Sequence, residues 1–465
     1  MNIWSPKQKR KMAGTPEHVS IRVSPHGYFA ALFVATFIAA FIVYIEYTLA
    51  GFALLALAWF VVPVLAFTDR VTFNGRRLFR TGFVPLIWSK VNASRSRLKL
   101  SDIEQVETQA LRALKRGHNV FYRYRTTVRG KGLVFSFSSG GEDYRRMAST
   151  LFPLLPENTL DNRSLEIRDY LTEPKSVLER AKRSHIPSSD VLEGSLRNFR
   201  NRRILTGTKY CENEQEEVSA LRRLGNQLRL SGFLLQASEA FRRAVLLRPT
   251  DGWLWLEFGR CLHSLAGSEK DERLNRRSIA MMRLAERHAG TDAALLTRLG
   301  ESYYQAGELS RSATVFQKAI STIGDNFRSA RGLAEVALRE GKIAHVIHHF
   351  WAANRVVETP ALRRWSSSEA IYFARLNDDD EYMELEISRV NLLEKLESVR
   401  RFSIRSALIG FPLILIGVVT ESYFLADVGW AISLSFLVVW VAMLLNRGLL
   451  SSRIPFDLVE KEREE

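Results

Sequence analysis

Cysteine is scarce in this chain, which has only Cys211 and Cys261 in 465 residues. Two cysteines cannot build a disulfide framework, and their spacing fits no CxxC metal-binding pattern. We therefore expect both to be small core residues of a protein in a reducing compartment.

The motifs of common catalytic and phosphate-binding sites are also missing. The sequence contains no GxxxxGK[ST] loop, GxSxG elbow, HExxH helix or GxGxxG fingerprint. The nearest approach to a metal site is His345, His348 and His349, which can share a helix face but have no Cys, Asp or Glu at matching spacing in that segment. We predict no cofactor, no metal and no enzymatic activity, with a hidden site of unfamiliar type as the alternative.

Acidic residues are few in one region. Between residues 70 and 131 the chain has 15 Lys and Arg against Asp102, Glu104 and Glu107, so this stretch holds 12 of the 16 net positive charges. The excess of positive charge is therefore local, and it points to an anionic surface or partner near this segment.

Four runs contain no charged residue at all. They are 28–45, 49–67, 406–420 and 428–445. As helices, the two N-terminal runs span roughly 27 to 29 Å, close to one hydrocarbon core. A second apolar run follows the first at once, which is unlike a cleavable signal peptide. The runs predict two transmembrane hairpins, within 1–69 and 404–447; a buried core hairpin is the alternative at each end.

The flanks of these runs predict their orientation, because Lys and Arg accumulate on the cytoplasmic side of short loops. The two hairpin tips, at 46–48 and 421–427, contain no Lys or Arg. We expect a protein of the cytoplasmic (inner) membrane with both termini and the whole middle segment in the cytoplasm. The cations that support this are Lys7, Lys9, Arg10, Lys11, Arg22, Arg70, Arg76, Arg77, Arg80, Arg400, Arg401, Arg405, Arg447 and Arg453.

Residues 70–172 have the pattern of a small sheet capped by a helix. Asn74-Gly75 predicts a two-residue turn, 120–125 alternates apolar with basic residues, and 142–155 has helical spacing. The order of these elements resembles bacterial PH-like domains that follow a two-helix membrane hairpin. The resemblance implies a binding or assembly domain rather than a catalytic one. The basic insert 111–118 departs from it and leaves the strand count between Val106 and Val120 open.

The basic residues of this domain are candidates for contact with anionic lipid headgroups, which attract polybasic segments beside a membrane. They could equally enforce topology and solvate the sheet. Nucleic acid is a less favoured partner, suggested only by the mixture of aromatic and basic residues at 121–125. The candidate lipid-binding residues are Arg76, Arg77, Arg80, Lys90, Arg95, Arg97 and Lys99.

Residues 218–360 repeat at a period of 34, which is typical of paired helices. The units are 218–251, 252–292, 293–326 and 327–360, with about seven extra residues expected in the turn of the second unit, near 268–274. A linker, 173–217, precedes them; capping helices, 361–403, follow; and 448–465 forms a charged tail. The recurring residues are Gly225, Gly259 and Gly300, with Phe241, Phe316 and Phe350, and Ala244, Ala319 and Ala353. These residues resemble those of the tetratricopeptide repeat (TPR).

The resemblance implies a helical solenoid that holds a peptide on its concave face. Arg222 and Asn226 resemble the start of a carboxylate clamp, but Arg260, Thr297 and Glu301 depart from its later positions. We therefore expect an acidic partner segment rather than a captured C-terminus. Fixed offsets in each unit put on this face Arg222, Asn226, Arg229, Trp253, Arg260, His263, Thr297, Glu301, Tyr304, Arg328, Arg331 and Glu335.

Together these patterns predict a multi-domain integral membrane protein with an α-helical TPR solenoid, a small PH-like α+β domain and two transmembrane hairpins. The expected function is a scaffold that binds a protein partner at the membrane face. The alternative is a regulator that senses anionic lipid through the basic domain.

Overall fold

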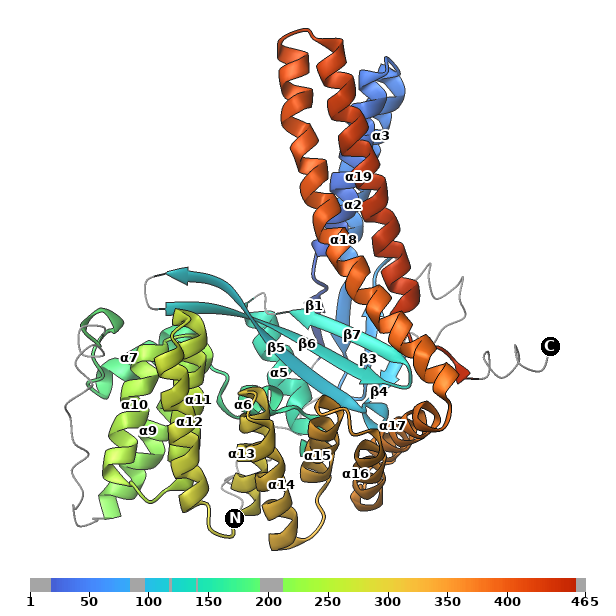
Figure 1. Ribbon diagram of the computed structural model, residues 1–465. Coiled ribbons are helices and arrows are strands. Elements are labelled where there is room, and N and C mark those ends of the chain that lie inside the picture. Colours follow the sequence, from blue (N-terminus) through green and yellow to red (C-terminus); the bar gives the residue numbers. More distant parts are fainter. Residues whose placement is uncertain (1–17, 84–96, 117–118, 139–140, 193–211, 457–465) are drawn as a thin grey trace. The chain divides into compact units, whose positions relative to one another are not determined.

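The computed structural model describes residues 18–83, 97–116, 119–138, 141–192 and 212–456. The chain divides into two compact units, coloured along the sequence in Figure 1. The first unit consists of Met1–Ser24 and Phe67–Ala370, and the second of Pro25–Ala66 and Ile371–Glu465. Each apolar hairpin therefore belongs to the second unit, and the sheets and helical repeats belong to the first.

The first unit contains two antiparallel sheets. One has four strands in the order β1-β2-β3-β4, and the other has three in the order β5-β6-β7. Two sheets replace the single small sheet that we predicted, because the chain breaks at the 3-10 turn Leu100–Asp102 and starts a new ladder. The strands are β1 Val19–Arg22, β2 Arg70–Phe73, β3 Arg77–Thr81, β4 Arg97–Lys99, β5 Gln105–Arg116, β6 Asn119–Gly130 and β7 Leu133–Ser138.

Strand β1 comes from before the first apolar hairpin. It pairs with β2 so that Val19 lies opposite Phe73 and Arg22 opposite Arg70. The hairpin is therefore inserted between the first two strands of one sheet. Our prediction that the domain begins at residue 70 misses this strand, because a four-residue strand has too little periodicity to be separated from an N-terminal tail.

The basic insert left the number of strands between Val106 and Val120 open, and the structure has one long strand, β5, there, followed by β6. β5 continues through the insert to Arg116, with a register shift between Arg112 and Leu114. Helix α5, Glu142–Leu151, then closes the domain. Its apolar residues follow helical spacing, and Tyr144, Met147 and Leu151 are buried against the sheets with Phe73, Val106 and Phe137.

The helical repeats follow as four antiparallel pairs in the described part of the chain. In the first pair a Cβ on Gly225 would lie 2.8 Å from the ring of Phe241, and in the third a Cβ on Gly300 would lie 2.7 Å from Phe316. Glycine thus lets the paired helices approach, as the TPR-like pattern requires. The pairs are α9 Glu212–Ser231 with α10 Leu234–Leu247, α11 Gly252–Glu269 with α12 Glu272–His288, α13 Ala293–Gln305 with α14 Leu309–Ile323, and α15 Phe327–Arg339 with α16 Ile343–Val356.

The second pair differs from our expectation of a long turn. Only Lys270 and Asp271 connect α11 to α12, and the extra residues lengthen both helices. Continued helix satisfies the backbone groups that a longer loop would leave to solvent. The extension also reaches the β hairpin, where the Arg112 guanidinium donates to the Gly267 carbonyl.

The segment that we predicted as a linker contains helix α7, Pro174–Arg183. Val177 and Ala181 are fully buried in the core that the first three repeats share. Its ten residues contain few apolar side chains, namely Val177, Leu178 and Ala181, which is why the sequence pattern resembled a linker.

The sheets and the repeats are joined within the first unit by direct contacts. The Val120 amide donates to the Gly232 carbonyl at 3.0 Å, and the buried Tyr124 hydroxyl donates to the Leu230 carbonyl at 2.6 Å. Gly232 has φ of +87°, and a Cβ there would collide with the Val120 carbonyl. The turn between α9 and α10 is therefore shaped to accept strand β6.

The second unit contains most of four helices that are long and apolar enough to cross a membrane. Helix α18 begins at Asp380, inside the predicted cap 361–403, and continues without a break into the third apolar run. Helix α19 begins at Tyr423, so the tip of this hairpin is shorter than the 421–427 that we predicted. Small residues let α18 and α19 approach closely, because Gly410 lies against Ser433 and Gly417 lies against Ala426. The helices are α2 His26–Tyr44, α3 Thr48–Thr68, α18 Asp380–Val419 and α19 Tyr423–Leu450; α17, Pro360–Asp378, precedes α18.

Within this unit, aromatic rings join the two hairpins. The Trp430 ring lies 5.1 Å from Phe37, 5.4 Å from Phe41 and 5.6 Å from Tyr44, between ring centroids. The Tyr44 hydroxyl donates to an Asp427 carboxylate oxygen at 2.6 Å. The two apolar ends of the sequence therefore pack as one bundle.

Candidate functional site: the concave face of the repeats

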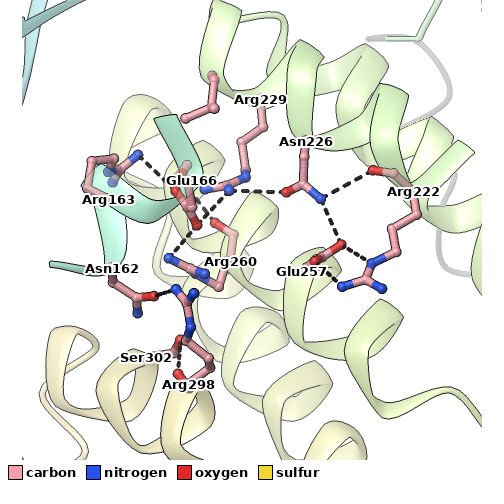
Figure 2. A network of polar contacts seen from close by, with 12 residues as sticks. Asn162, Arg163, Glu166, Arg222, Asn226, Arg229, Glu257, Arg260, Arg298 and Ser302 are labelled. Carbon is pink, nitrogen blue, oxygen red and sulfur yellow. Dashed lines mark hydrogen bonds and ion pairs between the residues drawn. The ribbon is translucent and has the colours of Figure 1, made fainter. Parts of the chain in front are cut away.

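The first half of the concave face is covered by a short helix of the same chain. Helix α6, Asn162–Tyr170, follows the domain of the two sheets. Asp161 caps it by accepting from the Ser164 amide at 2.8 Å, and also accepts from the Thr108 amide of β5 at 3.2 Å. Burial raises the pKa of Asp161. The two hydrogen bonds of Asp161 fix the start of α6 to strand β5. Figure 2 shows the Glu166 side chain of α6 directed at the repeats.

Glu166 lies between arginines from two successive repeats. Its carboxylate is 2.7 Å from the Arg229 guanidinium, pairs closely with Arg260, and is 4.0 Å from Arg163 on α6 itself. The side chains of Glu166 and Arg229 are only 5% and 2% exposed. Burial alone would raise the pKa of Glu166, but the arginine charges outweigh burial and lower it to about 2. This carboxylate is therefore ionised and held by the repeats.

A second buried carboxylate completes the network in Figure 2. Glu257 of α11 accepts two hydrogen bonds from Arg222, at 2.9 and 2.7 Å, and one from the Asn226 amide at 2.7 Å. Asn226 in turn accepts from Arg229 at 3.2 Å. The four groups form a continuous chain of charge-assisted bonds, which are the stronger class of hydrogen bond.

The basic half that we predicted to bind an acidic partner thus contacts acidic groups of its own chain. Arg222 and Asn226 contact Glu257, and Arg229 and Arg260 contact Glu166. Fixed offsets within a repeat carry no information about which distant segment packs on these residues, so the intramolecular acid was missed.

The second half of the face contains a pocket. Its volume is about 150 Å³, and its walls come from α13, α14, α15 and the 158–162 segment. Arg328 donates to Glu301 at 2.6 and 2.9 Å and to the Leu160 carbonyl at 3.1 Å, and Arg331 donates to Glu335 at 2.8 Å. Of the predicted partner-binding residues, the pocket gathers Glu301, Tyr304, Arg328, Arg331 and Glu335.

The remaining predicted face residues lie outside the pocket. Thr297 is buried and bonds to Ser329 at 2.9 Å between hydroxyls. The Trp253 indole donates to Asp292 at 2.8 Å, and the His263 ring lies 3.1 Å from the Asn275 amide oxygen. These three side chains contribute to contacts within and between repeats.

The three histidines lie on α16, as their spacing predicts. The rings of His345 and His349 are 6.4 Å apart and those of His348 and His349 are 5.2 Å apart, between centroids. Burial and the neighbouring rings lower the pKa of His349. Within the described ranges, no group of three or more His, Cys, Asp or Glu is arranged to hold a metal ion.

The candidate lipid-binding residues separate into different places. Arg80 is paired with the buried Asp69, and Arg97 lies on β4 opposite Phe79. Arg76, Arg77 and Lys99 border one pocket of about 560 Å³ at the β2–β3 turn. Lys90 and Arg95 lie outside the described residues.

Sequence reasoning missed two acidic residues of the face, Glu166 and Glu257, and the neighbouring Asn162 amide. A usable signal was present: Asp161 is a favoured N-cap residue, and its carboxylate accepts from the Ser164 amide at the start of α6. Leu165 and Ile167 of this helix pack in the core of the sheets, and Glu166 pairs with arginines of the repeats.

Comparison with known proteins gives structural likeness only. No family model matches the chain, and no curated protein matches it. Among solved structures, a thermophilic TPR protein of Thermus thermophilus is 16% identical with a TM-score of 0.29, over 43% of this chain and 100% of that one. PilF of Pseudomonas aeruginosa is 16% identical with a TM-score of 0.30, over 50% and 100%. MamA is 20% identical with a TM-score of 0.25, over 30% and 79%.

Proposed function

We propose that this protein is a membrane-anchored scaffold that binds a protein partner at the open half of its concave repeat face. One observation carries the proposal. Five predicted face residues from two successive repeats line a pocket, whereas in the first half Glu166 of α6 is buried between Arg229 and Arg260. The role is one of binding, and it needs no catalytic group.

The lining of the pocket indicates what a partner would insert. Leu160, Phe316 and Phe327 supply apolar walls, and Tyr304 lines the same pocket. A cavity of about 150 Å³ is large enough for one benzene ring. We therefore expect the partner to anchor one aromatic or large aliphatic side chain here, as interface hot spots commonly do.

Polar groups at the pocket suit the backbone of such a segment. The Asn162 Nδ2 donor and the Glu301 Oε2 acceptor are buried and have no hydrogen-bond partner among the described residues. The arginines beside them are already paired with Glu301 and Glu335. The open half therefore offers no net preference for an acidic segment, and an apolar anchor replaces the acidic segment that the sequence led us to expect.

The partner site is tested by cross-linking in the full-length protein in mild detergent. A photoreactive phenylalanine analogue at Glu335, on the pocket, should capture a defined partner, and the same analogue at Arg277, on the outer helix α12, should not. Adding Tyr304→Ala should remove the product without changing the helical circular dichroism. Equal capture from both positions would show that the pocket is not the binding surface.

The membrane anchor is a separate part of the proposal. Four helices have the length and composition to cross a bilayer, and Lys and Arg flank the hairpins but not their tips. Single cysteines at Tyr47 and Tyr423, in a Cys211→Ser, Cys261→Ala background, should react with a membrane-impermeant thiol reagent in intact cells. A cysteine at Ser310 should react only after permeabilisation, and the reverse pattern would reject the cytoplasmic placement.

A further inference from the structure

A second pocket lies in the first unit, between the four-stranded sheet and the start of α17. It is bordered by the β2–β3 turn, the end of β4 and the segment after α5, and its volume is about 560 Å³. This size is within the range of sites that bind small molecules and cofactors. Its apolar lining includes Leu100, Ile103, Leu154, Pro156, Pro360 and Ala361.

Three exposed cations gather at this pocket. The register of β3 and β4 places Arg77 directly opposite Lys99, and Arg76 precedes Arg77 in the turn. Across the described ranges, no carboxylate forms an ion pair with any of these three side chains. Like charges repel, so three neighbouring cations without an acid indicate a place for an anion.

The acid closest in sequence does not neutralise them. Asp102 follows the pocket residue Ser101, and its carboxylate is 2.9 Å from the Lys131 ammonium and 3.6 Å from the Arg364 guanidinium. Two cations from other elements thus already compensate Asp102. The positive charge of the pocket therefore remains available to a ligand.

The start of α17 adds a second feature on the same pocket. Thr359 and Pro360 line it, and the first turn of this 19-residue helix contains no acidic residue. The Thr359 Oγ1 atom is buried and has no hydrogen-bond partner in the parts of the chain that are described. Unpaired amides at a helix N-terminus favour phosphate and other anions.

We propose that this pocket binds a phosphate-bearing molecule that also has an apolar or aromatic moiety, of about nucleotide size. The arginine and lysine side chains would contact the phosphate oxygens, with Arg76 and Arg77 able to offer planar forks. The apolar residues of the lining would cover the rest of the molecule. This site is separate from the concave face of the repeats.

The test is calorimetric titration of the full-length protein in mild detergent with three probes: ADP, pyrophosphate and short-chain phosphatidylglycerol. We expect ADP to bind more tightly than pyrophosphate, because only ADP also fills the apolar part. Binding of ADP should weaken about tenfold or more in Arg76→Glu with Arg77→Glu, since two attractive charges become repulsive. Binding should also weaken as salt is raised.

The matched control is Arg123→Glu with Arg125→Glu, which reverses two exposed charges on β6 opposite Leu111 and Gln109 of β5, residues that do not line the pocket. It should change ADP affinity less than twofold. Binding of phosphatidylglycerol alone, lost in the Arg76/Arg77 variant, would keep the anion site but reject a soluble ligand. Failure of all three probes, or equal loss in both variants with an unchanged circular dichroism spectrum, would reject the site.

Discussion

The two halves of the concave face are built from the same repeat but do different things. In the first half, Glu166 of α6 is buried between Arg229 and Arg260. In the second half, arginines pair with carboxylates of the repeats themselves and leave a pocket beside the 158–162 segment. A repeated helix face thus does not by itself define a partner site. What covers the face decides whether it is filled by another segment of the chain or retains a pocket.

The comparison also explains why arginine dominates the covered half. A guanidinium can bond in several directions in one plane, so it can satisfy a carboxylate while remaining buried. Burial and neighbouring cations lower the pKa of Arg260 to about 10, which still leaves it charged at neutral pH. Removing the counter-ion of such a buried charge strongly destabilises the folded state.

The largest expected effect is therefore on the covered half. Glu166→Ala should destabilise the first unit by about 3 to 5 kcal/mol, because it leaves two buried arginines without their carboxylate. Thermal unfolding of the full chain in mild detergent, followed by circular dichroism, measures this. Glu335→Ala, at the partly buried Arg331–Glu335 pair of the open half, is the comparison and should cost less, because the Glu335 side chain is 36% exposed against 5% for Glu166. Equal losses of unfolding free energy in the two variants would contradict the proposed difference between the two halves of the face.

Acid should remove the same stabilisation in the wild-type protein. The folded pKa of Glu166 is about 2, below the ordinary 4.5 of an unfolded glutamate, so its contribution is present above about pH 4.5 and is lost as pH falls toward 2. A shift of this size corresponds to about 3 kcal/mol. Unfolding followed from pH 7 to pH 3 should show a shallower loss in Glu166→Gln than in wild type. Parallel curves would contradict this assignment.

Packing inside the repeats should not distinguish the two halves. Gly225→Leu and Gly300→Leu both force a side chain into a phenylalanine ring, at a cost of about 1 to 3 kcal/mol each. Their melting temperatures should fall by similar amounts, while Ala220→Leu, on the exposed side of α9, should have little effect. A large effect of only one glycine variant would mean that the covering helix also changes the packing of the repeats.

The smallest expected effect concerns the attachment of β6 to the covered half. Tyr124→Phe removes the buried hydrogen bond to the Leu230 carbonyl and should cost about 1 to 2 kcal/mol. Amide hydrogen exchange should rise first in the turn between α9 and α10. Faster exchange confined to α13 and α15 would instead place the effect of this bond in the open half.

Several features follow from the sequence alone. The spacing of Gly225, Phe241, Gly300 and Phe316 predicts paired helices, and the paired helices contain those contacts. Uncharged runs identify the four apolar helices by length and composition. These features are local, because one helical turn or one apolar run already contains the signal that specifies it.

Only the tertiary structure decided how distant segments meet. It placed β1 beside β2 across the inserted hairpin, Glu166 between Arg229 and Arg260, and Arg77 opposite Lys99 beside the start of α17. Periodicity reports that a face is buried, but the identity of the group that buries it depends on contacts between residues far apart in the chain. The free energy of such contacts comes from charge pairing and burial in three dimensions, which no local pattern records.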